Sequence, residues 1–438
     1  MEEEEELGMK FKLTKEEKKW VMYDVGNSAF VLLVSTILPI YFNYLAGNAG
    51  LSEVSYLAYW GYAASITTLI VAILGPILGT LADTKGFKKP IFAAFIAVGV
   101  IGCVIMGFTA SWLAFLVIFI IAKVGYSGSL IFYDSMLPDV TTEKRMDNVS
   151  SSGYAWGYIG SCVPFIVCLV FVLMYESIGL TMNAAMCIAF FIIAVWWAVM
   201  SVPLLKIYHQ KHYVERKPHA VRESFARIGR TFKNVKKEKK VFLFLLAFFF
   251  YIDGVYTIID MATAYGSALG LDTTGLLLAL LVTQFVAFPF AILFGRLASK
   301  YDTSKLIFIC IAAYFGIAVF AFFMSQQWQF WVLAVCVGMF QGGIQALSRS
   351  YFTKIIPPKQ SGEYFGLLDI CGKGASFVGT TLVGVVSQMT GDINKGVGAI
   401  AVLFVVGMIF FVLTVRTKGR EEECLTVETE EQTAEGRL

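Results

Sequence analysis

The chain has 438 residues, of which 57% are hydrophobic and 15% are charged, with a formal net charge of +3. Ordinary soluble domains have about 45–50% apolar and about 25% charged residues, so this composition excludes that class and predicts a membrane protein. The small net charge gives no reason to expect nucleic-acid binding.

Apolar runs of about 20 residues, the length that crosses a hydrocarbon core, recur along the whole chain. They are continuous and do not alternate, which predicts an all-α membrane protein and argues against a β-barrel. Twelve such runs are predicted, at about 20–46, 56–82, 90–109, 112–134, 151–175, 181–205, 241–268, 273–298, 304–324, 328–352, 361–388 and 395–415.

The first helix follows a polar N-terminal segment, residues 1–19, which begins with an acidic run that is expected to be disordered. Thr14 and Glu17 have the spacing of a capping box, so the helix is expected to begin there. Trp20 is expected to anchor it at the membrane interface. Asp24 and Asn27 lie near one face of this helix and form its polar stripe.

A charged hairpin, GTLADTKGFKK at residues 79–89, separates the second and third runs. Its glycines allow a tight turn, Asp83 can face a helix N-terminus, and its lysines are expected to hold the loop on the cytoplasmic side. Either it is an ordinary positively charged hairpin, or it is a latch that forms in only one conformation. The residues assigned to the latch are Gly79, Asp83, Gly86, Lys88 and Lys89.

A partly matching repeat of this hairpin, GRLASKYDTSK, occurs at residues 295–305. The chain is therefore predicted to consist of two related six-helix bundles, residues 20–205 and 241–415. A basic linker, residues 206–240, joins them, and an acidic tail, residues 416–438, is expected to be disordered. Apolar residues at helical spacing within the linker predict an amphipathic helix at the membrane surface.

Polar side chains, several of them ionisable, recur at helical spacing within the predicted spans of both halves. Since charges are costly in hydrocarbon, they mark either a pathway or a buried pair. In the first half the fourth run adds Lys123, Tyr126, Ser127 and Asp134; in the second half the stripes comprise Asp253, Thr257, Gln341, Gln345, Arg349, Asp369 and Lys373.

Nearly all of the 35 Lys and Arg residues fall in the two termini and the even-numbered loops. Positive loops stay on the cytoplasmic side, so both termini are predicted to be cytoplasmic, and the basic segments can contact anionic lipids. None of the cysteines has CxxC spacing, so free thiols and no metal are expected. His209 and His212 lie in the linker, where a solvated loop is favoured over a metal site.

Lys123, Asp253 and Lys373 are placed near the membrane midplane by counting about 1.5 Å of rise per residue. They form either a structural salt bridge or a central solute site. Two lysines against one aspartate favour a solute with a carboxylate or phosphate group. Proton coupling would require a carboxylate such as Asp24 or Asp253, because no histidine lies within a predicted span.

The hairpin at 79–89 resembles the signature of major facilitator transporters, although its copy has Ser299 where the acidic residue belongs. More specifically, the chain resembles the vacuole-effluxer, autophagy-related branch of that superfamily, through YDVGNSAF, SSSGYAWGYIGS, YIDGVYTI, GGIQALSRS and EYFGLLDICGK. The resemblance implies a cavity lined by the first, fourth, seventh and tenth helices. It also implies, less specifically, export of amino acids or similar solutes.

These observations predict a monomeric secondary transporter of a bacterial-type plasma membrane, working by alternating access without a cofactor or metal. Lys123 and Lys373 would hold an anionic or zwitterionic, amino-acid-like solute, and Asp253 an amine or a proton. The other residues assigned to the solute site are Asn27, Tyr126, Ser127, Thr257, Gln341 and Gln345. Coupling or gating is assigned to Asp24, Asp134, Asp369 and Arg349, and the latch is expected to contact the chain near Ser361 and Gly362.

Two other classes of protein were weighed. A membrane-embedded enzyme would need a nucleophile with a base, or a metal cluster, and the spans contain no such motif. A non-transporting sensor built on a transporter fold would keep the cavity but not the hairpin. The solute, its direction of travel and the coupling ion stay open.

Overall fold

The computed structural model describes residues 11–215, 238–268, 273–324 and 326–417. The acidic N-terminal run, the predicted amphipathic linker helix and almost all of the acidic tail lie outside these residues. The long helices of the first half are α2 (Lys15–Leu32), continued by α3 (Leu38–Asn48), α4 (Glu53–Ala82), α5 (Lys88–Met106), α6 (Trp112–Ser135), α8 (Met146–Leu173) and α9 (Met182–Ile207). Those of the second half are α11 (Lys239–Ala268), α12 (Thr273–Ala298), α13 (Thr303–Phe322), α14 (Gln327–Ile355), α15 (Ser361–Thr390), and α16 (Ile393–Ala399) with α17 (Ala401–Arg416).

Within the described residues, eleven helical segments are long and apolar enough to cross a membrane. The predicted span that is not among these, residues 361–388, corresponds to α15, which is 30 residues long but carries Glu363, Asp369 and Lys373 and is therefore more polar. The all-α membrane fold predicted from the sequence is confirmed.

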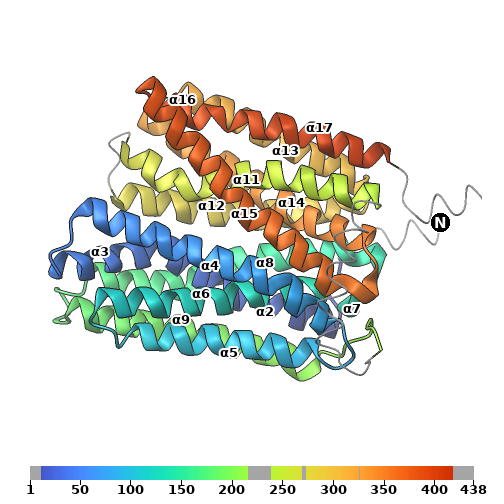
Figure 1. Cartoon of the computed structure of the whole chain (residues 1–438), viewed down its shortest axis with the longest axis horizontal. Helices are drawn as coiled ribbons and strands as arrows, with labels where there is room; N and C mark the ends of the chain where they lie inside the picture. Colours follow the sequence, from blue (N-terminus) through green and yellow to red (C-terminus); the bar gives the residue numbers. More distant parts are fainter. Residues whose placement is uncertain (1–10, 216–237, 269–272, 325, 418–438) are drawn as a thin grey trace, which may run out of the picture.

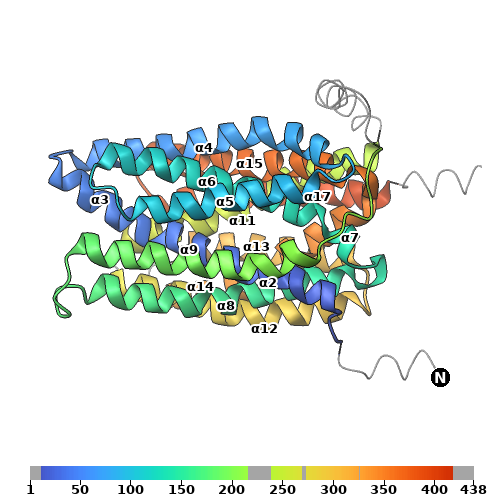
Figure 2. The ribbon, with the colours of Figure 1, turned by 90° about the horizontal axis from the view of Figure 1, so that it is seen from below.

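The two halves of the chain lie side by side (Figure 1). Helices α2 to α9 form one layer, and the helices from α11 onward form the other, with α15 crossing obliquely to reach α4. One buried apolar cluster is built between residues 20 and 208, and a second is built mainly between residues 241 and 411. The turn after α4, the short α7 (Leu137–Val140) and the start of α15 share one end of the molecule, which we call the hairpin end (Figure 2).

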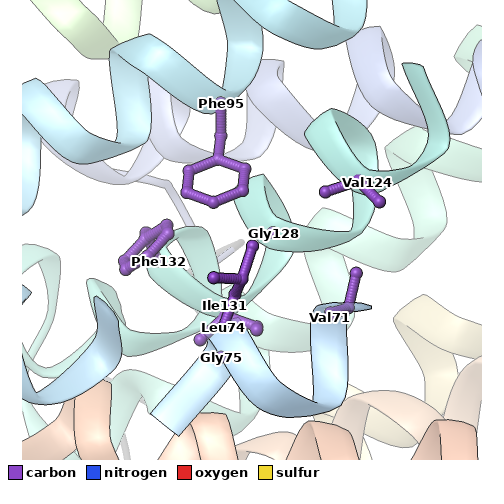
Figure 3. A pocket seen from close by; sticks show the side chains of 8 residues that line it. All are labelled: Val71, Leu74, Gly75, Phe95, Val124, Gly128, Ile131 and Phe132. Carbon is purple, nitrogen blue, oxygen red and sulfur yellow. The ribbon is translucent and has the colours of Figure 1, made fainter. Parts of the chain in front are cut away.

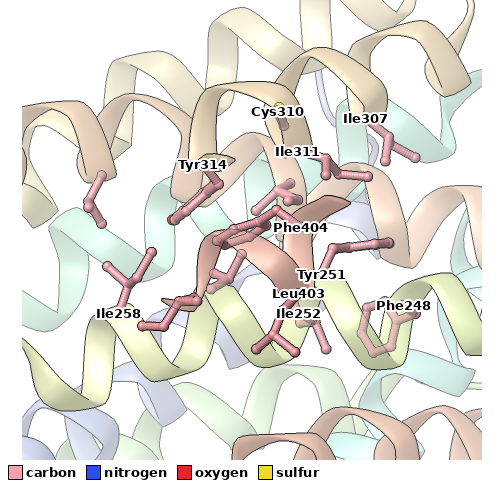
Figure 4. Packing of buried hydrophobic residues seen from close by; sticks show 14 of the residues in the cluster. Phe248, Tyr251, Ile252, Ile258, Ile307, Cys310, Ile311, Tyr314, Leu403 and Phe404 are labelled. Atoms are coloured by element: carbon pink, nitrogen blue, oxygen red, sulfur yellow. The ribbon is translucent and has the colours of Figure 1, made fainter. Parts of the chain in front are cut away.

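The two halves repeat the same local packing. In the first, the Tyr23 hydroxyl donates to Ser129 Oγ on α6 over 2.6 Å; in the second, the Tyr251 hydroxyl lies 2.7 Å from Ser348 Oγ on α14. Tyr251 and Phe404 both belong to the apolar cluster of the second half (Figure 4). A Cβ on Gly254, three residues after Tyr251, would lie 2.6 Å from the Phe404 ring, so this position requires glycine.

The start of the first helix is partly as predicted. Thr14 and Glu17 form the capping box, so that prediction is confirmed. The prediction that Trp20 is an interface anchor is wrong, because Trp20 is fully buried and stacks on Tyr133 of α6. Further along, a π-helical turn (Leu33–Ile37) interrupts the span just before Pro39, whose ring cannot continue regular helical bonding.

Candidate functional site

Asp83 joins the hairpin of the first half to the second half. It follows the last turn of α4 and is fully buried. Its Oδ1 accepts the Gly362 N–H over 2.8 Å, and its Oδ2 accepts the Glu363 N–H over 2.9 Å. The carboxylate thus occupies the N-terminus of α15, where free N–H groups and the helix dipole favour negative charge. The contact predicted from the sequence near Gly362 is present.

Close packing of two glycines makes this contact possible. A Cβ on Gly79 would collide with the Gly362 carbonyl, and one on Gly362 would lie 2.6 Å from the Gly79 carbonyl oxygen. Any larger residue would therefore push α4 and α15 apart. Gly86 turns the hairpin with a φ of +81°, a conformation that side chains disfavour.

Lys88 does not have the position that the sequence predicted for the hairpin lysines. It was expected to hold the loop on the charged side of the membrane, but its side chain is fully buried. Its ammonium donates to Ser361 Oγ over 2.9 Å and lies 3.6 Å from Asp83 Oδ1 and 3.9 Å from Asp139 Oδ2. Buried charges persist only when paired, so Lys88 is part of the contact between the halves. Lys89, in the first turn of α5, is half-exposed.

Asp139, on α7, connects this cluster to the beginning of the linker. Its Oδ1 accepts the His212 N–H over 2.8 Å and lies 3.0 Å from His212 Nδ1; Tyr208 donates to the other oxygen. Burial raises the pKa of Asp139, but the hydrogen bonds from His212 and Tyr208 and the charge of Lys88 outweigh it and hold the pKa below its ordinary value. His212 is therefore not simply a solvated loop residue.

Arg349, near the end of α14, makes several polar contacts between the halves. Its guanidinium lies 2.9 Å from Asp134 Oδ1 and 3.5 Å from Asp24 Oδ2, and it donates to the side chain and carbonyl of Ser150 on α8. We call Arg349, Asp24, Asp134 and Ser150 the arginine cluster. Three residues predicted separately as gating groups are thus brought together.

Aromatic rings enclose this guanidinium. Its carbon lies 4.6 Å from the Trp20 ring centroid and 4.4 Å from that of Tyr154, and Tyr133 donates to Asp24 Oδ2 over 2.8 Å. Only 4% of Arg349 is exposed. The cation is therefore held by both opposite charges and ring faces, and its removal would leave two carboxylates without their counter-ion. Asn27, expected to contact the solute, is buried and donates instead to Asp24 and to the Tyr23 carbonyl.

The second half has a counterpart of the Asp83 contact, although Ser299 replaces the acidic residue. Asn148 on α8 donates to Ser299 Oγ over 2.6 Å. The carboxylate comes from the facing helix: Asp147 pairs with Lys354 over 2.6 Å and accepts from Ser350 over 2.6 Å. Sequence reasoning missed Asp147, although an acidic residue in the first turn of a helix is a recognisable signal.

Polar residues extend from the arginine cluster toward the middle of the molecule. Tyr158 of α8 donates to Gln345 of α14 over 3.3 Å, across the boundary between the halves. On α6, Lys123 lies eleven residues before Asp134, about 16 Å along the helix axis. The Lys123 side chain is half-buried, with its ammonium 5.5 Å from the Phe119 ring centroid. The neighbouring predicted site residues include the half-buried Tyr126 and the buried Ser127 and Gln341.

Asp253 is not among these polar residues between the halves. It is fully buried inside the second half, where its Oδ1 accepts the Gly379 N–H over 3.0 Å and the Thr257 hydroxyl over 3.2 Å. Within the described part of the chain it has no ion pair, so the salt bridge considered between Asp253 and Lys123 is wrong. Lys373 is placed on α15, but its side chain lies outside the described residues; Asp369, one turn earlier, is half-buried.

A small pocket between α4, α5 and α6 has no ionisable lining (Figure 3). Leu74, Phe95 and Ile131 are among the side chains around it. It has none of the polar groups that would orient a solute, so we assign it to packing.

Comparison of the sequence with known proteins shows which family the chain belongs to. The family model described as "Vacuole effluxer Atg22 like" matches residues 13–146 and 140–424. The chain belongs to this family. It is 44% identical over 403 residues to the "Uncharacterized MFS-type transporter YxiO" of Bacillus subtilis (strain 168), covering 91% of this chain and 94% of the relative. It is also 22% identical to "Autophagy-related protein 22" of Coccidioides immitis (strain RS), covering 84% and 74%.

Solved structures place this Atg22-like protein in the major facilitator fold. The human organic anion transporter MFSD10 superposes with a TM-score of 0.67 at 12% identity, covering 90% of this chain and 97% of that one. The transporter FucP in its outward conformation gives 0.67 at 14% identity, covering 91% and 98%. The protein is therefore an integral, multi-pass transporter of the major facilitator class, and the prediction that it is not an enzyme is confirmed.

Proposed function

We propose that this Atg22-like protein is a secondary transporter that moves a small, amino-acid-like solute by alternating access. The observation that carries the proposal is the buried arginine cluster, in which a cation from one half is held by two carboxylates from the other. A buried ion pair between two bundles is costly to break while the bundles stay together. When the bundles separate, water can solvate both of its members. The Asp83 and Asp147 contacts at the same end support the same closed arrangement.

We further propose that the hairpin end is cytoplasmic, because lysines and arginines gather there. The termini would then be cytoplasmic, in a bacterial plasma membrane, with basic segments against anionic lipids and the protein acting as a monomer. The conformation described would be the one closed toward the cytoplasm.

The solute site proposed here lies between the halves, beyond the arginine cluster. Lys123 supplies the positive charge, while Tyr126, Ser127, Gln341 and Gln345 supply polar contacts. Lys373 is proposed as a second cation on α15. A lysine favours a carboxylate or phosphate on the solute. MFSD10, which shares this fold, is an organic anion transporter, and that supports such a solute.

The experiment that tests the site is a thermal-stabilisation screen of the purified protein against amino acids, peptides, nucleosides and organic anions. A ligand that binds the folded state raises the melting temperature. The hit is expected to lose its effect in Lys123→Gln and to keep it in Lys395→Gln, where the lysine forms a half-exposed pair with Asp392. A hit that stabilises Lys123→Gln as much as the parent protein would contradict the site.

A non-transporting sensor remains the second candidate, because a bound solute could be read out by the same closed arrangement. It predicts binding without flux.

A further inference from the structure

Asp253 is a buried acid in which only one of the two carboxyl oxygens has hydrogen-bond partners. The residue lies fourteen positions into α11, about 21 Å from its start, and none of its surface is exposed. Oδ1 has two donors, Gly379 N–H and Thr257 Oγ1, whereas Oδ2 is buried without any hydrogen-bond partner. An ionised carboxylate in this position would be strongly disfavoured, and a proton on Oδ2 removes the buried charge.

Among the side chains that the structure describes, those packed against this part of α11 form no ion pair with Asp253. α17 has no ionisable side chain between residues 401 and 415, and it meets α11 through Phe404 at Gly254. α14 contributes the neutral Ser348 to Tyr251. On α15, Asp369 and Lys373 precede Gly379 by ten and six residues, about 15 and 9 Å along the axis. Asp24, the other membrane carboxylate considered for protons, has Arg349 as its counter-ion.

Helix α15, which contacts Asp253, also forms part of the contact between the halves at the hairpin end. Gly379 packs so closely that a Cβ there would lie 2.7 Å from Asp253 Oδ1 and would collide with Thr257. Seventeen residues earlier, about 25 Å along α15, Gly362 donates to Asp83 of the other half. A movement of α15 relative to α11 on opening of the hairpin end would therefore change the surroundings of Asp253 directly.

We infer that Asp253 is the proton-binding site of the transport cycle, holding a proton on Oδ2 in this conformation and releasing it when α15 moves away from α4. The inference rests on the proposed function and names its coupling ion. A proton from water on the side away from the hairpin end bonds to Oδ2, and the same O–H bond breaks later to return it to water. A pocket lined by Thr257, Met261 and Tyr265 lies on that side of the acid.

The test is infrared difference spectroscopy of the purified protein in lipid, which detects the C=O band of a protonated carboxyl without any solute. The parent protein is expected to show one such band at pH 7 that disappears on alkalinisation. Asp253→Asn is expected to lack it, and the matched variant Asp302→Asn, at an exposed carboxylate that caps α13, is expected to keep it. In Arg349→Gln, with opening verified by spin-label distances, the band is expected to weaken at the same pH.

A band unchanged in Asp253→Asn, or equally strong in an opened Arg349→Gln protein, would overturn the inference. If Asp253→Asn does not fold, Thr257→Val keeps the carboxyl but removes a hydroxyl donor to Oδ1. The band must then shift in frequency, and an unmoved band overturns the assignment. Solute flux distinguishes failure of the proposed function from failure of the proton site. A protein that transports solute but lacks the carboxyl band refutes the proton site alone.

Discussion

Arg349→Gln should open the hairpin end. The substitution removes the guanidinium that joins Asp24 and Asp134 of the first half to the second half, at distances of 3.5 and 2.9 Å. Both carboxylates then lose their counter-ion in a site that admits little water. The glutamine keeps a single amide donor toward Ser150, so the closed arrangement loses most of its polar contact there.

The expected size of the effect follows from burial. Removing one partner of a buried ion pair costs about 3–5 kcal/mol, and only 4% of Arg349 is exposed. Taking the lower value, because one donor is retained, and a factor of ten for each 1.4 kcal/mol, the ratio of closed to open molecules falls about 100-fold. A protein closed in about 99% of molecules would then be closed in about half.

Spin-label distances measure this population. Thr142, in the loop before α8, and Lys359, before α15, are exposed and belong to opposite halves at the hairpin end. The parent protein should give one short distance, and Arg349→Gln should add a longer one of comparable weight. Arg296→Gln, an exposed arginine at the end of α12, is the matched control and should resemble the parent. An unchanged distribution in Arg349→Gln would refute the reasoning.

Further predictions concern the contacts around this cluster. Gly79→Ala should favour the open arrangement in the same distance measurement, whereas Gly47→Ala, with open space around its Cβ, should not. Asp139→Asn should lower the melting temperature at neutral pH; because the pKa of Asp139 is held below its ordinary value, its stabilisation is lost as pH falls, so the difference should close below about pH 4. Lys354→Gln and Asp147→Asn should be coupled by about 0.5–3 kcal/mol in a double-mutant cycle of unfolding, and additive effects would contradict their pairing.

The fold and several site residues could be predicted from local patterns. Apolar runs report membrane spans directly, and the spacing of polar residues selected Asp24, Asp134 and Arg349, which converge. The Asp83 contact was predictable because a helix N-terminus favours a negative charge.

Burial of amphipathic residues could not be predicted in this way. Trp20 and Lys88 lie at helix ends, where an interface anchor or a cytoplasmic charge is the common outcome. Their partners, Tyr133 and Ser361, are 113 and 273 residues away, and only tertiary packing brings them together. Asp253 was predicted to hold an amine or a proton from its depth alone, since helix depth reports distance along the membrane and not which side of a bundle a residue faces.

Counterflow of the stabilising solute in proteoliposomes tests the central claim most directly. Vesicles loaded with unlabelled solute and diluted into a trace of labelled solute reveal any carrier by exchange, whatever ion is coupled. Alternating access predicts a transient accumulation of label that saturates with solute and requires Lys123. Binding of the solute to the reconstituted protein without any accumulation of label would contradict transport and favour the sensor.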